Sequence, residues 1–492
     1  MSPEQLIATI LLLPAAAAAG IAVCRSRPNV REAVTLATSA VLTLCALALL
    51  PSVLAGGRAH VHVLEVMPGL PIAFEVEPLG MLFALIASAL WFVSGLYSIG
   101  YMRGNDETHQ TRFYACFALA IAAAMGIALA ANAFTLFLFY EALTLVTYPL
   151  VTHHGTAEAR RSGRVYLALL IGTSIVFLLP ALVFTWLAAG TTDFEPGGVL
   201  GDKLGPVTTA ALLALYMFGI GKAALMPFHR WLPAAMVAPT PVSALLHAVA
   251  VVKAGVFSVV KIVVYLFGTD ALSRGVPTGW LVALAGFTIV AASVVALRSD
   301  NLKRRLAYST VSQLSYIVLA TAVLAPLSIA AAALHIATHA LGKITLFFAA
   351  GSIYTATHKT EVSQLDGIGR HMPWTMTAFA IGALSLIGIP PTAGFLSKWM
   401  MFQGAASAEN YAVIAVLALS TLLNAAYFLP IIHAAFLRPR PVGQPRHGEA
   451  PWPMVVAILA VAAATLLLPL ASEIPLELAR SVGGLTAYGG GP

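Results

Sequence analysis

Eight ionisable residues lie well inside long apolar stretches of this sequence, away from their ends, and they are the groups that could carry chemistry if those stretches span a bilayer. Glu141 is the one acid, and the others are Lys222, Lys253, Lys343 and Lys398 with His247, His335 and His339. An ionisable side chain in a bilayer interior costs several kcal/mol and usually marks an ion path. Amines and imidazoles suit protons better than sodium, which favours clustered oxygens. The residue types therefore favour a proton path.

Glu141 and Lys222 could form a gate. Glu141 lies deep in the apolar segment Phe137-Leu-Phe-Tyr-Glu-Ala-Leu-Thr144, and Lys222 lies among glycines ahead of Pro227. Burial disfavours the charged form of either group, and an opposite charge nearby favours it again. Separating such a pair frees the lysine to release its proton. A Glu–Lys pair of variable strength would therefore control proton transfer.

Three further residues share one helix face. His335, His339 and Lys343 are spaced i, i+4 and i+8, so they form a row that could act as a proton wire. Two other interpretations stay open for the histidines. Each could be a core residue bonded to a backbone carbonyl, or they could be haem or metal ligands with His247 on a facing helix. Lys261 lies near a helix end, where we expect its amine to snorkel to the interface.

Prolines interrupt the apolar segments that carry the lysines. Pro227, Pro239 and Pro241 break the seventh and eighth segments, and Pro390 with Pro391 breaks the twelfth just ahead of Lys398. Broken segments at matching places in two halves indicate inverted repeats with an ion site at mid-membrane. We expect two five-helix repeats, with Lys222 and Lys398 in matching roles.

Composition indicates the element that must position these groups, a membrane-spanning helix. Of 492 residues, 59% are hydrophobic and 10% charged, and the mean hydropathy is +0.88. A soluble protein could not hide so much apolar surface. Because a spanning helix needs about 20 mainly apolar residues, we predict an all-α integral membrane protein with about 14 transmembrane helices. They lie near 4–23, 31–54, 78–101, 112–131, 133–151, 164–189, 207–226, 240–267, 279–297, 304–324, 327–354, 374–400, 411–436 and 453–470; a count of 13 is the alternative.

Four regions follow from these stretches. They are an N-terminal set of three helices (1–110), a first half-channel repeat (111–270), a second half-channel repeat (271–436), and a loop with the last helix and a short tail (437–492). The segment before the first stretch carries Glu4 and lacks Lys and Arg, so we interpret that stretch as a membrane helix rather than a signal peptide.

The loops alternate in charge. One set holds Arg25, Arg27, Arg31, Arg103, Arg112, Arg160, Arg161, Arg164, Arg230, Arg298, Lys303, Arg304, Arg305, Lys359, Arg370, Arg438, Arg440 and Arg446. The opposite set holds Arg58, Lys203, Arg274 and Arg480 among acids that include Glu75 and Glu77. The positive-inside rule puts the first set in the cytoplasm and both termini outside. Topology thus explains the net charge of +7, and we expect no nucleic-acid binding.

Cofactor signals are lacking in the sequence. Cys24, Cys45 and Cys116 are far apart without CxxC spacing, which predicts no disulfide framework, iron–sulfur site or zinc site. We find no dinucleotide fingerprint and no nucleophilic triad either. We therefore expect no cofactor and no redox or other catalytic centre within the chain.

Three segments carry a resemblance to a known family. They are Met226-Pro-Phe-His-Arg-Trp-Leu-Pro-Ala-Ala-Met-Val-Ala-Pro-Thr-Pro-Val-Ser-Ala-Leu-Leu-His247 continuing to Val252-Lys-Ala-Gly255, Asn301-Leu-Lys-Arg-Arg-Leu-Ala-Tyr-Ser-Thr-Val-Ser-Gln-Leu-Ser-Tyr316, and His335-Ile-Ala-Thr-His-Ala-Leu-Gly-Lys343. Over roughly 78–436 the chain resembles the antiporter-like family of membrane proteins. This family includes the A and D components of Mrp-type cation/proton antiporters, the proton-pumping membrane subunits of respiratory complex I, and related subunits of membrane-bound hydrogenases.

The resemblance implies a role for each buried group. Glu141 falls at the family's membrane glutamate and Lys222 at its lysine partner on the broken seventh helix. Lys253 with His247 ahead of it matches the eighth-helix relay, and this combination is more similar to the D and A components of Mrp antiporters than to complex I. His335, His339 and Lys343 match the central relay, and Lys398 matches the terminal residue of the broken twelfth helix.

The resemblance also implies the function and its setting. The first expectation is a proton-translocating subunit of a multi-subunit monovalent cation/proton antiporter, in a bacterial-type inner membrane and with other membrane subunits as partners. Sodium or potassium as the exchanged ion is left open. One alternative is a translocase subunit of a complex I-like or hydrogenase-like redox complex. Another is an energy-coupling membrane partner of an inorganic-carbon uptake enzyme.

Overall fold

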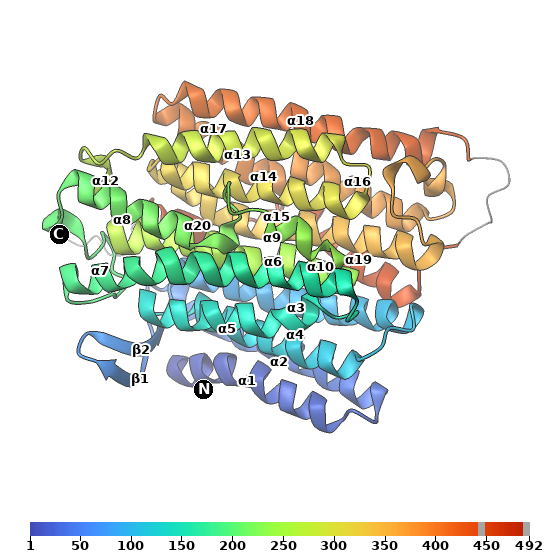
Figure 1. The fold of residues 1–492 in the computed structure, drawn as a ribbon, viewed down its shortest axis with the longest axis horizontal. Coiled ribbons are helices and arrows are strands. Elements are labelled where there is room, and N and C mark those ends of the chain that lie inside the picture. The colour runs from blue at the N-terminus through green and yellow to red at the C-terminus, as the bar shows by residue number, and fades with distance from the viewer. Residues whose placement is uncertain (441–447, 486–492) are drawn as a thin grey trace.

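The computed structural model describes residues 1–440 and 448–485, and within them the chain is a bundle of long helices that run side by side (Figure 1). The first five are α1 (Pro3–Val23), α2 (Pro28–Leu54), α3 (Pro78–Gly104), α4 (Gln110–Ala128) and α5 (Ala133–Val151). Side chains cap several starts: Ser2, Glu77 and Asn132 accept hydrogen bonds from amide groups of the first turn. The predicted stretches agree with these bounds within a few residues.

The later helices follow the same plan. They are α6 (Ala157–Thr173) continuing through a π turn into α7 (Leu179–Ala189), α13 (Gly279–Arg298), α14 (Leu302–Ala322), α15 (Pro326–Thr357), α18 (Tyr411–Leu437) and α19 (Trp452–Leu467). Within the described ranges, ten helices are long and apolar enough to cross a membrane. The chain is thus a mainly helical membrane protein, as predicted; the number of spans and the inverted repeats stay predictions.

The broken helices are where the prolines predicted them. The seventh segment consists of α8 (Pro206–Gly219), a 3₁₀ turn that contains Lys222 (η3, Gly221–Ala223) and α9 (Trp231–Ala234). The eighth consists of α10 (Thr240–Ala244), a π turn (η5, Leu245–Val249) and α11 (Val251–Lys261), followed by a second π turn (η6, Ile262–Phe267). The twelfth is divided into α16 (Pro373–Ile387) and α17 (Ala393–Ser407), with Pro390 and Pro391 between them.

A β-hairpin lies between α2 and α3, an element that the all-α prediction did not include. Strand β1 (His60–Met67) pairs antiparallel with β2 (Leu70–Glu75), from His60 opposite Glu75 to Met67 opposite Leu70. Gly69 takes a positive φ of 75° in the turn, which glycine adopts without steric cost. A search for stretches of about 20 apolar residues cannot detect strands this short.

The loops gather at two ends of the bundle (Figure 1). The basic end holds the loops around residues 24–28, 104–110, 152–156 and 358–372, and Arg31 there donates to Gln110 over 2.7 Å. The hairpin end holds residues 55–77 and 190–205 with α12 (Thr269–Ser273) and α20 (Glu473–Val482). The predicted basic loops therefore share one end, except that Arg446 lies outside the described residues. Which end faces the cytoplasm stays a prediction.

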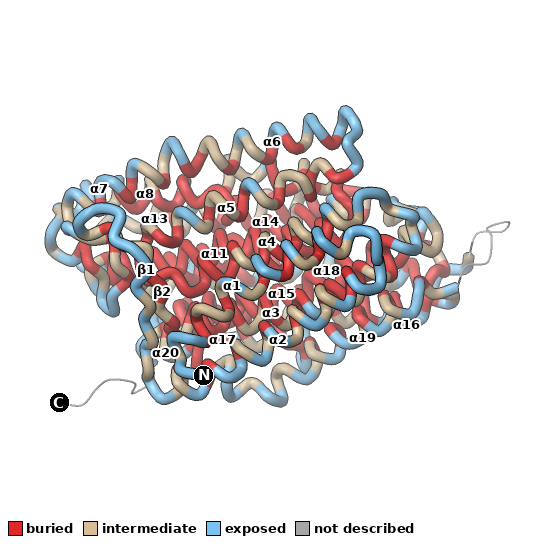
Figure 2. The backbone as a smooth tube through the Cα atoms, turned by 90° about the horizontal axis from the view of Figure 1, so that it is seen from below, coloured by how far each residue is buried: buried red, intermediate tan, exposed pale blue. Residues whose placement is uncertain are grey.

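Burial separates an inner core from an outer ring. Every residue of α15 from Ser328 to Ile353 is buried, as is nearly all of α10 and α11 (Figure 2). The outer helices instead expose large apolar side chains: Leu44, Leu187, Phe287 and Leu422 are 62–70% exposed. Exposed apolar surface on this scale suits contact with lipid tails. The ionisable groups of the core are thereby screened from both lipid and water.

Candidate functional site

The predicted lysines and histidines lie together in the core. Lys222, His247, Lys253, His335, His339, Lys343 and Lys398 are at most 3% exposed, whereas Glu141 on α5 is partly exposed. They come from the broken seventh and eighth segments, from α15 and from α17. We call the row formed by Lys253, His339, His335, Lys343 and Lys398 the polar axis.

Lys222 is held by α5. Its Nζ donates to the Tyr140 carbonyl over 2.7 Å and to Thr144 Oγ1 over 2.6 Å, and it lies 3.2 Å from the centre of the Tyr140 ring. The Tyr140 hydroxyl in turn accepts a hydrogen bond from the Lys222 amide over 3.0 Å. Because α8 ends at Gly219, the 3₁₀ turn can present both the amide and the amine of Lys222 to one neighbouring helix.

Glu141 follows Tyr140 directly on α5, yet it forms no ion pair with Lys222 among the pairs that join described residues. Its Oε1 is buried and lacks a hydrogen-bond partner. The structure thus brings the two predicted gate residues to neighbouring positions with the lysine bound to neutral groups. A buried carboxylate oxygen without a hydrogen-bond partner would gain a hydrogen bond if the lysine amine moved to it.

The polar axis begins with a contact between α11 and α15. Lys253 Nζ lies 2.5 Å from His339 Nδ1, and the His339 and His335 rings follow one another at a centroid distance of 5.9 Å. The spacing of one helical turn, predicted from sequence, therefore does place the imidazoles in a row. Lys253 reaches the row from the eighth segment.

His335 connects the row to the broken twelfth segment. Its Nδ1 lies 2.9 Å from Ser397 Oγ on α17, and its Nε2 lies 3.1 Å from Gln313 Oε1 on α14. Both ring nitrogens are thus engaged by protein groups, which favours the relay over a haem or metal ligand. Gln313 and Lys398 then share one acceptor, since both donate to the Leu386 carbonyl, Lys398 over 2.5 Å.

A second branch leaves from Lys343. Its Nζ donates to Ser309 Oγ over 2.7 Å, and the Tyr427 hydroxyl donates to the same Ser309 oxygen over 3.1 Å. Tyr427 also donates to Asn424, which donates to the Tyr316 hydroxyl. The Tyr316 ring lies 4.6 Å from Lys398 Nζ, so both branches reach Lys398.

The hydroxyls and amides of these branches were missed from sequence. Ser309 and Gln313 lie on α14, Ser397 on α17, and Asn424 and Tyr427 on α18. One signal was available: α14 is more polar than its neighbours, yet all but three of its residues are buried. A polar helix inside a membrane bundle must direct its polar groups at protein partners.

His247 is buried beside the axis without a bond to it. It lies in the π turn η5 with its ring 4.7 Å from that of Phe347, and neither of its ring nitrogens has a hydrogen-bond partner. The helix-breaking prolines Pro239 and Pro241 lie just ahead, at the start of α10. Both ring nitrogens of His247 are therefore free to bind another group, and its role in a relay stays a prediction.

The prediction for Lys261 was wrong. Its side chain is 1% exposed and pairs with Glu77 over 3.0 Å instead of reaching the interface. Glu77 also accepts hydrogen bonds from the Tyr265 hydroxyl and from the amides of Leu79 and Gly80. The charge pattern predicts a loop position for Glu77, whereas the residue caps α3 and turns its carboxylate into the bundle. Its four donors make burial of the charge tolerable.

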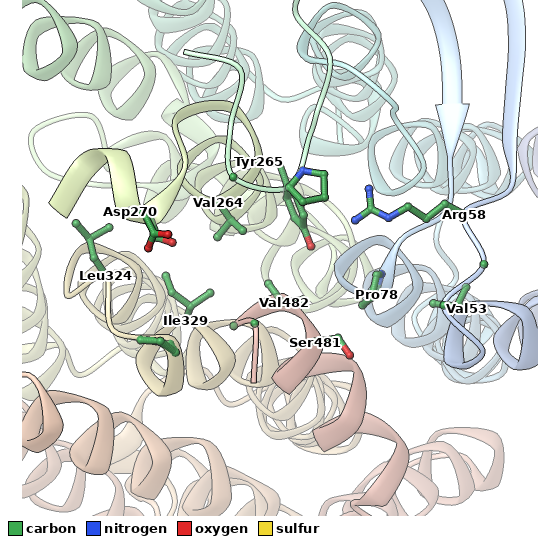
Figure 3. A pocket seen from close by; sticks show the side chains of 18 of the residues that line it. Val53, Arg58, Pro78, Val264, Tyr265, Asp270, Leu324, Ile329, Ser481 and Val482 are labelled. Carbon is green, nitrogen blue, oxygen red and sulfur yellow. The ribbon is translucent and has the colours of Figure 1, made fainter. Parts of the chain in front are cut away.

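A cavity of about 930 Å³ lies outside this ion pair, at the hairpin end (Figure 3). Tyr265 and Arg58 line it next to each other, and Asp270 of α12 lies across from them (Figure 3). Arg58 pairs with Glu75 over 3.1 Å. Burial raises the pKa of the Glu75 carboxyl, although the charges of Arg58 and Lys261 oppose this shift.

No group of three or more His, Cys, Asp or Glu side chains placed to hold a metal ion occurs in the part of the chain that the structure describes. The chemistry available to the site is proton exchange among amines, imidazoles, hydroxyls and one carboxylate. Such a row can pass protons along the bundle without any redox centre.

Known proteins of similar sequence include components of an oxidoreductase, an antiporter and a hydrogenase. The chain is 35% identical to NADH-quinone oxidoreductase subunit N of Desulforudis audaxviator, over 95% of this chain and 96% of that protein. It is 31% identical to the A/B component of a probable K(+)/H(+) antiporter of Rhizobium meliloti, of which it spans 45%. It is 28% identical to hydrogenase-4 component B of Escherichia coli, with 63% of that protein covered.

Solved structures share the fold. A chain of the Mrp complex from Dietzia sp. superposes with a TM-score of 0.88 at 22% identity, covering 98% of this chain and 97% of the other. A chain of an archaeal membrane-bound sulfane sulfur reductase gives 0.86 at 24% identity, with 98% of each covered. Residues 130–424 match the family model described as NADH:quinone oxidoreductase/Mrp antiporter, transmembrane. The chain belongs to that family.

Proposed function

We propose that this chain is the proton-translocating subunit of a multi-subunit monovalent cation/proton antiporter. The observation that carries the proposal is the polar axis, in which Lys253, His339 and His335 lead into Ser397 and the Leu386 carbonyl bound by Lys398. The antiporter and oxidoreductase components among the relatives support a role in ion translocation. The name of the Rhizobium relative favours potassium over sodium as the exchanged ion.

The gate consists of Glu141 and Lys222 on opposing segments. Lys222 now binds the Tyr140 carbonyl and Thr144, which lie one residue before Glu141 and three after it on α5. A small movement of the amine along α5 would exchange these neutral acceptors for the orphaned carboxylate oxygen. Pairing would hold the proton on Lys222, and separation would release it toward Lys253.

The relay then depends on lysines whose hydrogen-bond partners carry no charge. A lysine bound to a carbonyl, hydroxyl or imidazole keeps a hydrogen bond whether it is charged or neutral, because a neutral amine still donates. Lys253, Lys343 and Lys398 all have such partners. Proton loss at one lysine therefore need not leave a buried carboxylate unpaired. Lys398 is the last group of the row and would exchange its proton with the other side of the membrane.

The test is transport by the assembled complex in proteoliposomes. We expect Glu141→Ala and Lys222→Ala each to abolish coupled proton transport, while both variants still insert and assemble. The matched control is Lys203→Ala at the hairpin end, whose exposed amine donates to the Ala189 carbonyl and should be dispensable. Normal transport by either gate variant would remove the gate from the mechanism.

A complex I-like redox pump is the second candidate. The 35% identity to an NADH-quinone oxidoreductase subunit over nearly the whole of both chains favours it. The third, an energy-coupling partner of an inorganic-carbon uptake enzyme, would use the same axis. Purification from the native membrane with identification of the companion subunits separates them. Small membrane subunits alone would support the antiporter. Iron–sulfur or hydrogenase-like subunits would support the redox pump, and a carbonic-anhydrase-like companion would support the partner of an inorganic-carbon uptake enzyme.

A further inference from the structure

A second cavity, of about 230 Å³, opens at the basic end and is not part of the gate or the polar axis. Glu107, His154 and Lys303 line it together with Tyr101, Thr240 and Tyr354. It lies over the start of α10, the helix that leads into the π turn of His247. The cavity therefore connects the surface of the basic end with the segment that carries the uncommitted histidine.

Two titratable side chains of this cavity, Glu107 and His154, form a cluster with His153. The Glu107 carboxylate lies between two imidazoles, with Oε2 3.5 Å from His153 Nε2 and Oε1 3.4 Å from His154 Nε2. His154 is exposed, whereas His153 is 2% exposed and its ring nitrogens have no hydrogen-bond partner. Histidine changes its charge between about pH 5 and 8. The cluster therefore runs from an exposed imidazole through a carboxylate to a buried imidazole.

Lys303 lies between the cluster and the core. Its Nζ lines the cavity and donates to the Ala238 carbonyl over 2.6 Å, immediately before the helix break at Pro239. Glu107 and Ala238 line the same cavity as Lys303, and the chain runs from Ala238 through α10 into the π turn of His247. Lys303 is thus bound at the start of the segment that carries His247.

We propose that Glu107, His153 and His154 form a proton-collecting site at the basic end, which supplies the polar axis through Lys303 and His247. The inference rests on the proposed function, since it needs an axis that carries protons. A hydronium ion gives its proton to His154 and the Glu107–His153 pair accepts it. The proton passes to the Lys303 amine and from its ammonium group to a free ring nitrogen of His247.

Such a site matters most when protons are scarce. Other ionisable groups that face the cluster are Arg112, which donates to the His153 carbonyl over 2.8 Å, Lys359 at the cavity, and the phenols of Tyr101 and Tyr354. The cations Arg112 and Lys359 stabilise a negative charge at Glu107, and the imidazoles supply the nitrogen atoms that accept the proton. Without the two imidazoles, proton uptake depends on the hydronium concentration alone. A diffusible buffer should then substitute for the missing imidazoles.

The experiment compares initial proton-transport rates of the assembled complex in proteoliposomes from pH 6 to 8. We expect the initial rate of proton transport to fall at least about tenfold at pH 8, and little at pH 6, in Glu107→Gln and in the double variant His153→Gln/His154→Gln. Imidazole added on the side of the basic end should restore the rate. The control is His62→Gln/Glu65→Gln at the hairpin end, an exposed His–Glu pair at 3.6 Å that should change nothing.

The outcomes separate this inference from the proposed function. Unchanged transport rates in the Glu107 and histidine variants would overturn the collecting site. An equal loss of transport at every pH without rescue by imidazole would also overturn it, because that is how a merely structural cluster behaves. Lys343→Ala is measured in the same vesicles, and it should lose transport at every pH with no rescue. If Lys343→Ala transports normally, the proposed function fails whatever the result at Glu107.

Discussion

Buried lysines in this chain have two kinds of partner. Lys222, Lys343 and Lys398 bind carbonyl and hydroxyl oxygens, and Lys253 binds an imidazole. Lys261 instead binds a carboxylate that three other donors also hold. Neutral acceptors leave a lysine free to lose its proton, whereas the saturated carboxylate of Glu77 holds the charge of its partner. The chemistry of the acceptor thus separates the lysines that we propose to carry protons from Lys261.

Removal of the structural lysine should cost stability more than transport. Lys261→Met leaves the buried Glu77 carboxylate without its counter-charge, and breaking a buried ion pair costs about 3–5 kcal/mol. We expect a lower unfolding temperature in detergent, measured by the loss of helical circular dichroism. Transport per correctly folded complex should stay near that of the native protein.

The double variant Lys261→Met/Glu77→Gln provides the control for this prediction. It removes both charges and keeps the amide donors partly satisfied, so it should be more stable than Lys261→Met alone. A complete loss of transport in well-folded Lys261→Met would instead assign the pair to the proton path.

At the scale of elements, the helix breaks are positioned by close backbone packing. A Cβ atom on Gly255 of α11 would lie 2.3 Å from the backbone of Lys222 and Ala223, so only glycine lets the 3₁₀ turn rest on α11. Gly394 at the start of α17 is similar, since its Cβ would lie 1.8 Å from the Ser385 carbonyl of α16. At each of these two breaks, a glycine thus allows two segments to approach each other closely.

Gly255→Ala should therefore disable the gate without touching an ionisable group. The added methyl group displaces the turn and with it the two hydrogen bonds of the Lys222 amine to α5. We expect a loss of about 1–3 kcal/mol in stability, as for other overpacked sites, and a severe loss of proton transport. The control is Gly172→Ala in α6, where a Cβ meets no atom within 4 Å. Equal transport by both variants would contradict this account of the turn.

The sequence predicts the charged groups of the site better than their partners. Lysines and histidines stand out against apolar stretches, and prolines mark the breaks. Ser309, Ser397 and Asn424 do not stand out, because hydroxyls and amides in membrane helices commonly bond their own backbone. Glu77 was missed because a cap residue at a helix end resembles a loop acid. The alternation from His60 to Val63 was a strand signal that a search for long apolar stretches passes over.

At the scale of the whole molecule, the axis and the two cavities define a direction for proton movement, from one end of the bundle to the other. The collecting site opens at the basic end, and the larger cavity with Arg58 and Tyr265 opens at the hairpin end. The physiological direction of proton uptake then depends on which end faces the cytoplasm, and the positive-inside rule assigns the basic end to it.

Labelling of single cysteines in intact cells tests this orientation. With Cys24, Cys45 and Cys116 replaced by serine, Val63→Cys on the exposed hairpin and Arg161→Cys on α6 supply one reporter for each end. We expect a membrane-impermeant maleimide to label Val63→Cys in intact cells and Arg161→Cys only after permeabilisation. The reverse pattern would put both termini inside and make Glu107 collect protons from outside the cell. The same axis would then carry protons into the cell, along the membrane potential.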